Sequence, residues 1–150
     1  MRPFYPNYED GSLDPEVEAF LSSSSIPLRI ACNAKQGFPS LNSMWFEYRD
    51  GNLWCATHES SALLDYLRKD DRCAFEVAPN EPPYCGVRGQ AKATLTKDGA
   101  GELLSRLISR YLGDTNPSLE QWLLSRIEEE WVIRLDPTWV SAWDYRGRMR

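Results

Sequence analysis

The chain of 150 residues contains a single histidine, His58, and four cysteines that form no Cys-x-x-Cys pair. A zinc site usually draws four closely spaced ligands, so we expect no metal centre. The Gly-x-Gly-x-x-Gly and Walker phosphate loops are also missing, which argues against the common nucleotide-binding folds. We expect the cysteines to be buried, reduced thiols. A Cys–His nucleophile pair is the alternative, because Cys55 is close to His58 in sequence.

Positive charge and long apolar runs are also scarce. Lys and Arg number 17 against 22 Asp and Glu, which gives a net charge of −5. This sign opposes general nucleic-acid binding, which depends on phosphate contacts. No apolar stretch approaches the roughly 20 residues that cross a bilayer, and the first residues contain no apolar signal core. We therefore expect a cytoplasmic protein that binds neither nucleic acid nor a membrane.

The composition is that of an ordinary globular domain. Hydrophobic residues make up 42 % and charged residues 26 % of the chain, which excludes a disordered or fibrous protein. The length suits one domain that spans residues 1–150. Pro3 and Pro6 oppose regular structure near the start, so residues 1–13 are predicted to form a flexible arm.

Hydrophobic patterning predicts several short strands and four small helices. The strands are expected at residues 26–32, 40–48, 53–57, 73–77, 84–96, 131–135 and 139–144. The helices are expected at residues 15–21, 60–67, 101–112 and 117–127. Asp50-Gly51 predicts a tight hairpin, and Asp136-Pro137 predicts a turn between the last two strands. This order favours a mainly β, antiparallel barrel, closed or partly closed, with peripheral helices.

The first candidate site is the end of the third strand together with the start of the next helix. A helix N-terminus presents free N–H groups and holds phosphate readily. Thr57, Ser60 and Ser61 would add hydroxyl donors, and His58 is a group that titrates near neutral pH. Ordinary helix capping by a serine or threonine explains the same residues, so both interpretations stay open.

The second candidate site is residues 42–46, where Asn42 and Ser43 precede Met44 and Trp45. A planar heterocycle could lie along such a strand, bonding to the backbone and stacking on the rings. A core strand with one polar face is the alternative.

The third feature is a high number of tryptophans, six in all. Aromatic residues are enriched at dimer interfaces as well as in cores. We expect Trp122 and Trp131 to be core residues and Trp143 to belong to a site or an interface. The C-terminal arginines, Arg146 among them, could reach an anionic ligand or form a solvated tail.

These motifs, in this order, resemble the flavin-binding split-barrel family related to pyridoxamine 5′-phosphate oxidase. The resemblance covers residues 26–146 and depends on order and spacing, since each motif alone is weak. The matching segments are Gly37 with Pro39, Met44-Trp45-Phe46, Asp50-Gly51, Thr57, residues 68–73, residues 81–84, Val87-Arg88-Gly89, Leu135-Asp136-Pro137 and Trp143-Asp144.

The resemblance implies a six-stranded antiparallel Greek-key split barrel that forms a homodimer, with FMN in the cleft between the subunits. It places residues 42–46 against the isoalloxazine ring and assigns Thr57 and the start of the next helix to the phosphate. Trp143 and Arg146 would complete the cofactor site.

The sequence departs from the family pattern at the phosphate end. The basic residues of the pattern fall on Ala62 and Leu63. A charge-assisted hydrogen bond is worth roughly 1.5–3 kcal/mol, so cofactor binding is expected to be weaker unless Arg88 or the tail arginines substitute. The strand also has Leu41 and Phe46 where the vitamin-forming enzyme has Arg and Lys, which argues against that particular activity.

The resemblance therefore implies an FMN-dependent oxidoreductase that acts on a small-molecule substrate. Two alternatives stay open. One is a deazaflavin-dependent reductase with the same fold, and the other is a non-catalytic protein that binds flavin or haem. A haem protein would need an axial ligand, for which His58 is the one histidine available.

Overall fold

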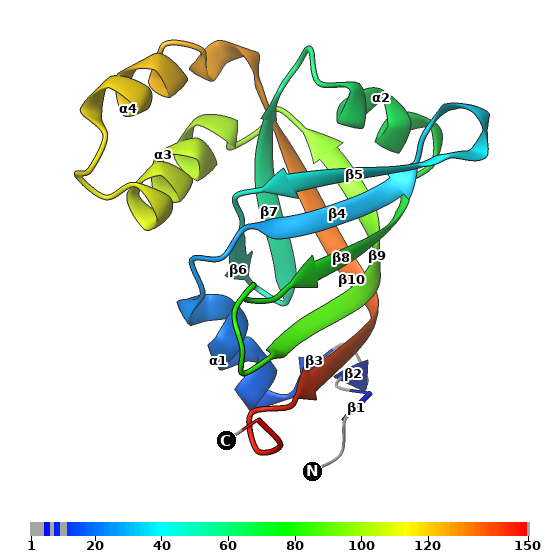
Figure 1. The fold of residues 1–150 in the computed structure, drawn as a ribbon. Helices are drawn as coiled ribbons and strands as arrows, with labels where there is room; N and C mark the ends of the chain where they lie inside the picture. The colour runs from blue at the N-terminus through cyan, green and yellow to red at the C-terminus, as the bar shows by residue number, and fades with distance from the viewer. Residues whose placement is uncertain (1–4, 7, 10–11, 150) are drawn as a thin grey trace.

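The structure is a computed structural model that describes residues 5–6, 8–9 and 12–149. Its main feature is a curled antiparallel sheet in which seven described strands follow the order β5-β4-β8-β9-β10-β7-β6 (Figure 1). These strands are β4 (Leu28–Asn33), β5 (Pro39–Met44), β6 (Glu47–Arg49), β7 (Asn52–His58), β8 (Arg72–Val77), β9 (Cys85–Thr96) and β10 (Glu130–Asp144). The predicted mainly β, antiparallel class is confirmed, but this path has seven strands where six were expected.

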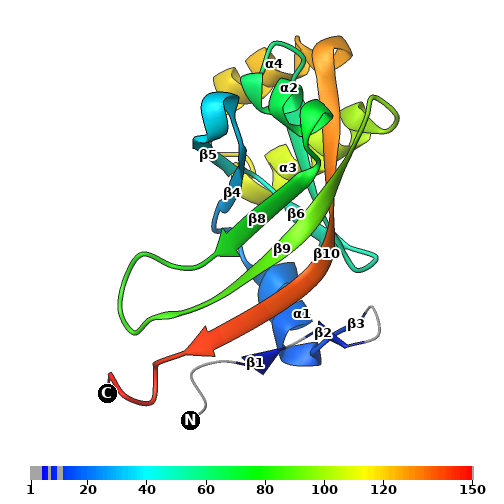
Figure 2. The same ribbon diagram turned by 90° about the vertical axis from the view of Figure 1, so that its right-hand side faces the viewer.

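Four α-helices of the described chain lie around the sheet: α1 (Pro15–Ser23), α2 (Ala62–Lys69), α3 (Ala100–Tyr111) and α4 (Pro117–Leu124). Two short 3₁₀ turns, η1 (Lys35–Gly37) and η2 (Ile127–Glu129), complete the helical structure. Figures 1 and 2 show α2, α3 and α4 gathered at one end of the sheet and α1 at the other. None of these helices is long and apolar enough to cross a membrane.

The hydrophobic core fills the concave side of the sheet. Alternate residues of β4 and β8 point into it, among them Ile30 and Phe75, which are 1 % and 3 % exposed. Helix α2 contributes Leu64 and Leu67 to the same core. A smaller cluster joins α3 to β10 through Leu103 and Val132, among other residues. Burial of apolar surface stabilises the fold by about 25 cal/mol per Å². This burial holds α2 and α3 against the sheet.

The predicted strand at residues 40–48 is in fact two strands. Residues 45 and 46 interrupt it, because Phe46 turns inward and is fully buried while Trp45 packs on Tyr111. The predicted hairpin is confirmed: Asp50 and Gly51 have φ values of 54° and 78°. Both angles lie in the left-handed region that a two-residue type I′ turn requires.

The predicted turn at Asp136-Pro137 is wrong. β10 runs through it as a single strand of 15 residues, with a register shift against β9 between Pro137 and Trp139. A β-bulge tolerates proline because the bulged position does not need every ladder hydrogen bond. The first half of β10 also pairs with β7, so β10 links both sides of the curled sheet.

The predicted arm contains regular structure at its described positions. β1 (Tyr5–Pro6) pairs with β10, and β2 (Tyr8–Glu9) pairs with β3 (Ser12–Leu13). Pro6 is therefore compatible with a short strand, contrary to the expectation. Residues 1–4, 7 and 10–11, including Pro3, lie outside the described residues, and the flexibility of the arm stays a prediction.

Helix α4 differs from its prediction in burial. Trp122 was expected in the core, but its side chain is 53 % exposed, and α4 buries none of its residues. Leu123 and Ile127 are half-buried rather than buried. Trp131, the other tryptophan expected in the core, is half-buried against it. Helix α4 therefore lies over the end of the molecule without becoming part of the core.

Candidate functional site

A cleft of about 380 Å³ lies between the ends of β5 and β7 and the helices α3 and α4. Five residues singled out from the sequence line it: Ser43, Met44, Trp45, Thr57 and His58. The remaining lining residues are Ala56, Leu104, Leu107, Leu119, Leu123, Arg126 and Glu130. The two candidate segments, 42–46 and 57–61, thus contribute to one cleft although different parts of the sheet carry them.

The strand β5 lies at the edge of the sheet and pairs with β4 on one side. An edge strand presents a row of backbone N–H and C=O groups that other molecules can bind. Ser43 and Met44 lie at the end of this strand, beside the cleft. Asn42 does not line the cleft, and its amide donates to the Ser40 hydroxyl at 3.0 Å. The cleft therefore joins an exposed strand edge to the apolar surface of α3.

His58 is held by a hydrogen-bond network that uses both of its ring nitrogens. Nδ1 lies 2.7 Å from the Ser60 hydroxyl and 3.1 Å from the Ser60 backbone nitrogen. Nε2 is hydrogen-bonded to the Glu129 carboxylate. The hydrogen bond from His58 lowers the pKa of Glu129. Both ring nitrogens of His58 are thus occupied within the chain.

The hydroxyls at the phosphate end differ in their freedom to bind a ligand. Ser60 does not line the cleft, and its hydroxyl is hydrogen-bonded to His58. Ser61 caps helix α2 by accepting a hydrogen bond from the Leu63 N–H at 3.3 Å, as the helix-capping interpretation predicts. Its own O–H remains able to donate. Thr57 lines the cleft, and within the described chain its hydroxyl makes no hydrogen bond. Thr57 is therefore the available hydroxyl donor that lines the cleft, whereas Ser61 keeps a free O–H but does not line the cleft.

Arg126 is a cleft residue that the sequence reasoning missed. It follows α4, lines the cleft, and places its guanidinium 4.3 Å from the ring centroid of Trp122. The sequence shows an arginine at position 126, but it does not show that the chain after α4 returns to the cleft. Arg126 thus supplies a cation to the cleft that Thr57 and His58 line, whereas Ala62 and Leu63 carry no charge.

A buried acid faces the same cleft. Glu130 is 6 % exposed, and burial raises its pKa. Arg126 and His58 oppose that rise electrostatically, whereas Glu129 adds to it. The cleft thus contains a basic group and an acid whose charge is costly to bury.

Three predicted cofactor residues lie elsewhere. Trp143 and Arg146 line a different cavity, near α1, and Arg88 places its guanidinium 5.4 Å from the Trp143 ring centroid. Arg146 forms an ion pair with Asp144. Within one chain these residues do not join the cleft at β5 and β7. Arg150, the last of the tail arginines, lies outside the described residues.

Most of the cysteines are buried, as predicted. Cys32, Cys55 and Cys73 are buried, and Cys85 is half-buried. Desolvation raises the pKa of Cys73 to about 12 and that of Cys55 well above its ordinary value. The proposed Cys55–His58 nucleophile pair is contradicted, because His58 bonds to Ser60 and Glu129, and the Cys55 thiol stays buried and protonated.

Comparison with known proteins finds solved structures with a similar fold. No protein-family profile matches the chain, and no curated protein matches its sequence. Among solved structures, the conserved hypothetical protein Rv2991 from Mycobacterium tuberculosis superposes with a TM-score of 0.76 at 21 % identity, covering 91 % of this chain and 88 % of that one. An F420 reductase gives a TM-score of 0.65 at 20 % identity, covering 85 % and 98 %.

A third similar structure connects the fold to the predicted family. It is a Clostridium acetobutylicum protein related to general stress protein 26 of B. subtilis, of the pyridoxinephosphate oxidase family. Its TM-score is 0.62 at 16 % identity, covering 86 % of this chain and 91 % of that one. The resemblance to pyridoxamine 5′-phosphate oxidase-like proteins is therefore confirmed at the level of the fold.

Proposed function

We propose that this protein is an FMN-dependent oxidoreductase, with the cofactor bound in the cleft between β5 and β7. The observation that carries the proposal is the convergence of Ser43, Met44 and Trp45 with Thr57 and His58 on one cleft. Two separate sequence segments were expected to hold the ring and the phosphate of one molecule, and they line the same cavity. The curled sheet would then be the Greek-key split barrel of the flavin-binding family.

The residues of the cleft fit such a cofactor. The free backbone edge at the end of β5 suits the polar rim of an isoalloxazine ring, and Trp45 with Leu107 offers apolar surface. Arg126 and Thr57 are the cleft residues suited to the phosphate, and Ser61, outside the cleft lining, is a further hydroxyl at the start of α2. A bound flavin would supply hydride transfer, while the chain would bind it, orient it and exclude water.

We also propose a homodimer with the cofactor at the subunit interface. The convex face of the sheet carries exposed apolar side chains, with Leu41 72 % and Trp139 42 % exposed. Arg29 and Glu76 lie near them around a shallow cavity. An apolar centre with charges around it is the usual composition of a dimer interface. The cofactor proposal does not use Arg88, Trp143 or Arg146.

Three further candidates remain, and particular observations bear on the first two. The similarity to an F420 reductase favours a deazaflavin as the alternative cofactor. A haem protein is disfavoured, because an axial bond to His58 would displace its hydrogen bond with Glu129 or those with Ser60. A storage protein that binds flavin without turnover would use the same cleft.

The first experiment is the visible absorption spectrum of the freshly purified protein, with mass spectrometry of the released chromophore. We expect FMN at close to one molecule per subunit, or its uptake on addition. If the protein is colourless and takes up a deazaflavin but no FMN, a deazaflavin replaces FMN as the proposed cofactor. A protein that binds neither would overturn the proposal. Reduction of an added acceptor with turnover then separates an enzyme from a storage protein.

A further inference from the structure

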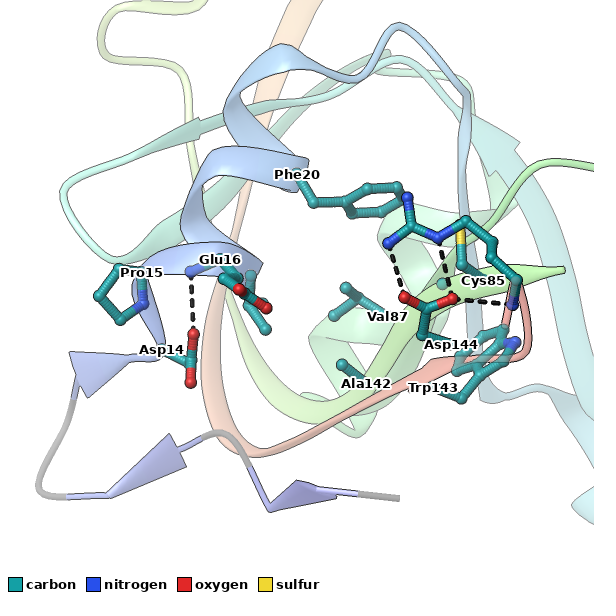
Figure 3. Close-up of a pocket in the computed structure, with 12 residues that line it drawn as sticks. Asp14, Pro15, Glu16, Phe20, Cys85, Val87, Ala142, Trp143 and Asp144 are labelled. Carbon is teal, nitrogen blue, oxygen red and sulfur yellow. Dashed lines mark hydrogen bonds and ion pairs between the residues drawn. The ribbon is translucent and has the colours of Figure 1, made fainter. Parts of the chain in front are cut away.

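A further cavity lies apart from the proposed cofactor cleft, at the end of the molecule that carries α1. It has a volume of about 530 Å³ and opens between the first turn of α1, the start of β9 and the end of β10 (Figure 3). Small-molecule sites commonly have volumes of about 300–1,000 Å³. The cavity is therefore large enough for a ligand of its own, and the cofactor proposal gives it no role.

One part of the wall of this cavity is apolar and aromatic. Phe20 of α1 lines it together with Val87, Ala142 and Trp143 of the sheet. The Trp143 ring packs directly on Gly86, where an added Cβ would lie 2.5 Å from Cζ2 of the ring. Arg88 lies over the same ring at 5.4 Å. Because these contacts hold Trp143, the aromatic wall is formed before any ligand binds.

The charges around the cavity are mostly negative. Among the lining residues, Asp14, Glu16 and Asp144 oppose the cation Arg146. The Arg88 guanidinium lies outside the lining, over the Trp143 ring. Arg146 is already committed, since its backbone and guanidinium donate three hydrogen bonds to Asp144. Asp14 accepts from the Glu16 backbone N–H at 2.8 Å and so caps α1. The Glu16 carboxylate makes no hydrogen bond within the described chain, and it interacts electrostatically with Arg146. The formal charge of the lining side chains is therefore −2.

We propose that this cavity is a second ligand site, which binds a small organic cation with an aromatic or other flat apolar body. The apolar body would pack against Phe20 and Trp143, and its ammonium group would face Asp14 and Glu16. Aromatic faces and carboxylates both attract cations. An anion such as a flavin phosphate would meet net repulsion here. Helix capping explains why acids begin α1, but it does not require an aromatic cavity beside them.

The test compares two ligands of nearly equal shape and opposite charge, 3-phenylpropylamine and 3-phenylpropanoate. Each is titrated into the ¹⁵N-labelled protein, and the indole N–H signal of Trp143, identified with Trp143→Phe, is followed by NMR. We expect the amine to shift this signal and the acid to bind at least tenfold more weakly. Equal binding of both ligands, or no binding of the amine at millimolar concentration, overturns the proposal.

A charge-removing double variant locates the site. Asp14→Asn with Glu16→Gln removes both carboxylates while asparagine still caps the helix. The variant is expected to bind the amine about tenfold more weakly. Asp114→Asn with Glu120→Gln is the matched control at the start of α4, and it should bind like the unmodified protein. Equal affinity in the two double variants would place the amine elsewhere. Because the titration does not depend on a flavin, it can fail or succeed independently of the proposed function.

Discussion

The rings of Trp45 and Tyr111 stack almost parallel, with centroids 5.2 Å apart and planes 6° from each other. Trp45 belongs to the break between β5 and β6, whereas Tyr111 ends α3. The Tyr111 hydroxyl donates to the Ile26 carbonyl at 3.0 Å and accepts from the Phe46 backbone N–H at 3.2 Å. One side chain thus joins α3 to the strand break that shapes one side of the cofactor cleft.

Tyr111→Phe should therefore destabilise the protein by about 1–2 kcal/mol, because a partly buried backbone carbonyl and a backbone N–H both lose a partner. The free energy of unfolding in urea measures this change. Tyr66→Phe is the control, since the Tyr66 hydroxyl makes no hydrogen bond within the described chain, and it should change stability by less than about 0.5 kcal/mol. Equal effects of the two substitutions would remove the special role of Tyr111.

Arg126→Gln should weaken FMN binding about tenfold, because a charge-assisted hydrogen bond to phosphate is worth roughly 1.5–3 kcal/mol and 1.4 kcal/mol is tenfold. Fluorescence titration of the flavin measures the dissociation constant. Lys35→Gln removes an equal charge from the exposed turn η1 and should leave the constant unchanged. If both variants lost affinity equally, a general effect of net charge would explain the result.

Glu130→Gln should raise the melting temperature at pH 7 but not at pH 4. Burial raises the pKa of Glu130 in the folded state, so the unfolded chain binds fewer protons at pH values between the ordinary pKa, about 4.3, and the raised one. Stability is therefore lost as the pH rises through that window, and glutamine removes the loss. Glu128→Gln, an exposed neighbour, serves as the control in the same thermal scans. A stabilisation by Glu130→Gln that is equal at both pH values would contradict this explanation.

Trp139→Asp should dissociate the proposed homodimer, because it puts a charge into the apolar part of the convex face. Light scattering of the unmodified protein is expected to give twice the chain mass of 17.2 kDa, and the variant a single chain mass. Trp122→Asp changes a more exposed tryptophan on α4, with 53 % exposure against 42 %, and should remain dimeric. A monomeric unmodified protein would refute the dimer itself.

Local signals in the sequence predicted the elements whose structure depends on a few neighbouring residues. Asp14 accepts from the first turn of α1, and Pro15 begins that helix as expected. Asn116 caps α4 in the same way. The Asp50-Gly51 turn follows from two residues that tolerate positive φ. Patterning also identified both segments that line the cleft.

The sequence by itself determined the fold class, the helix starts, the tight hairpin and five of the cleft residues, because capping, turn chemistry and alternation act over a few residues. Tertiary structure alone decided the strand break at Trp45, the continuity of β10 through Pro137 and the return of Arg126 to the cleft. It also separated Trp143 and Arg146 from that cleft. Each of these depends on which distant surface a side chain meets, and such contacts leave no local periodicity in the chain.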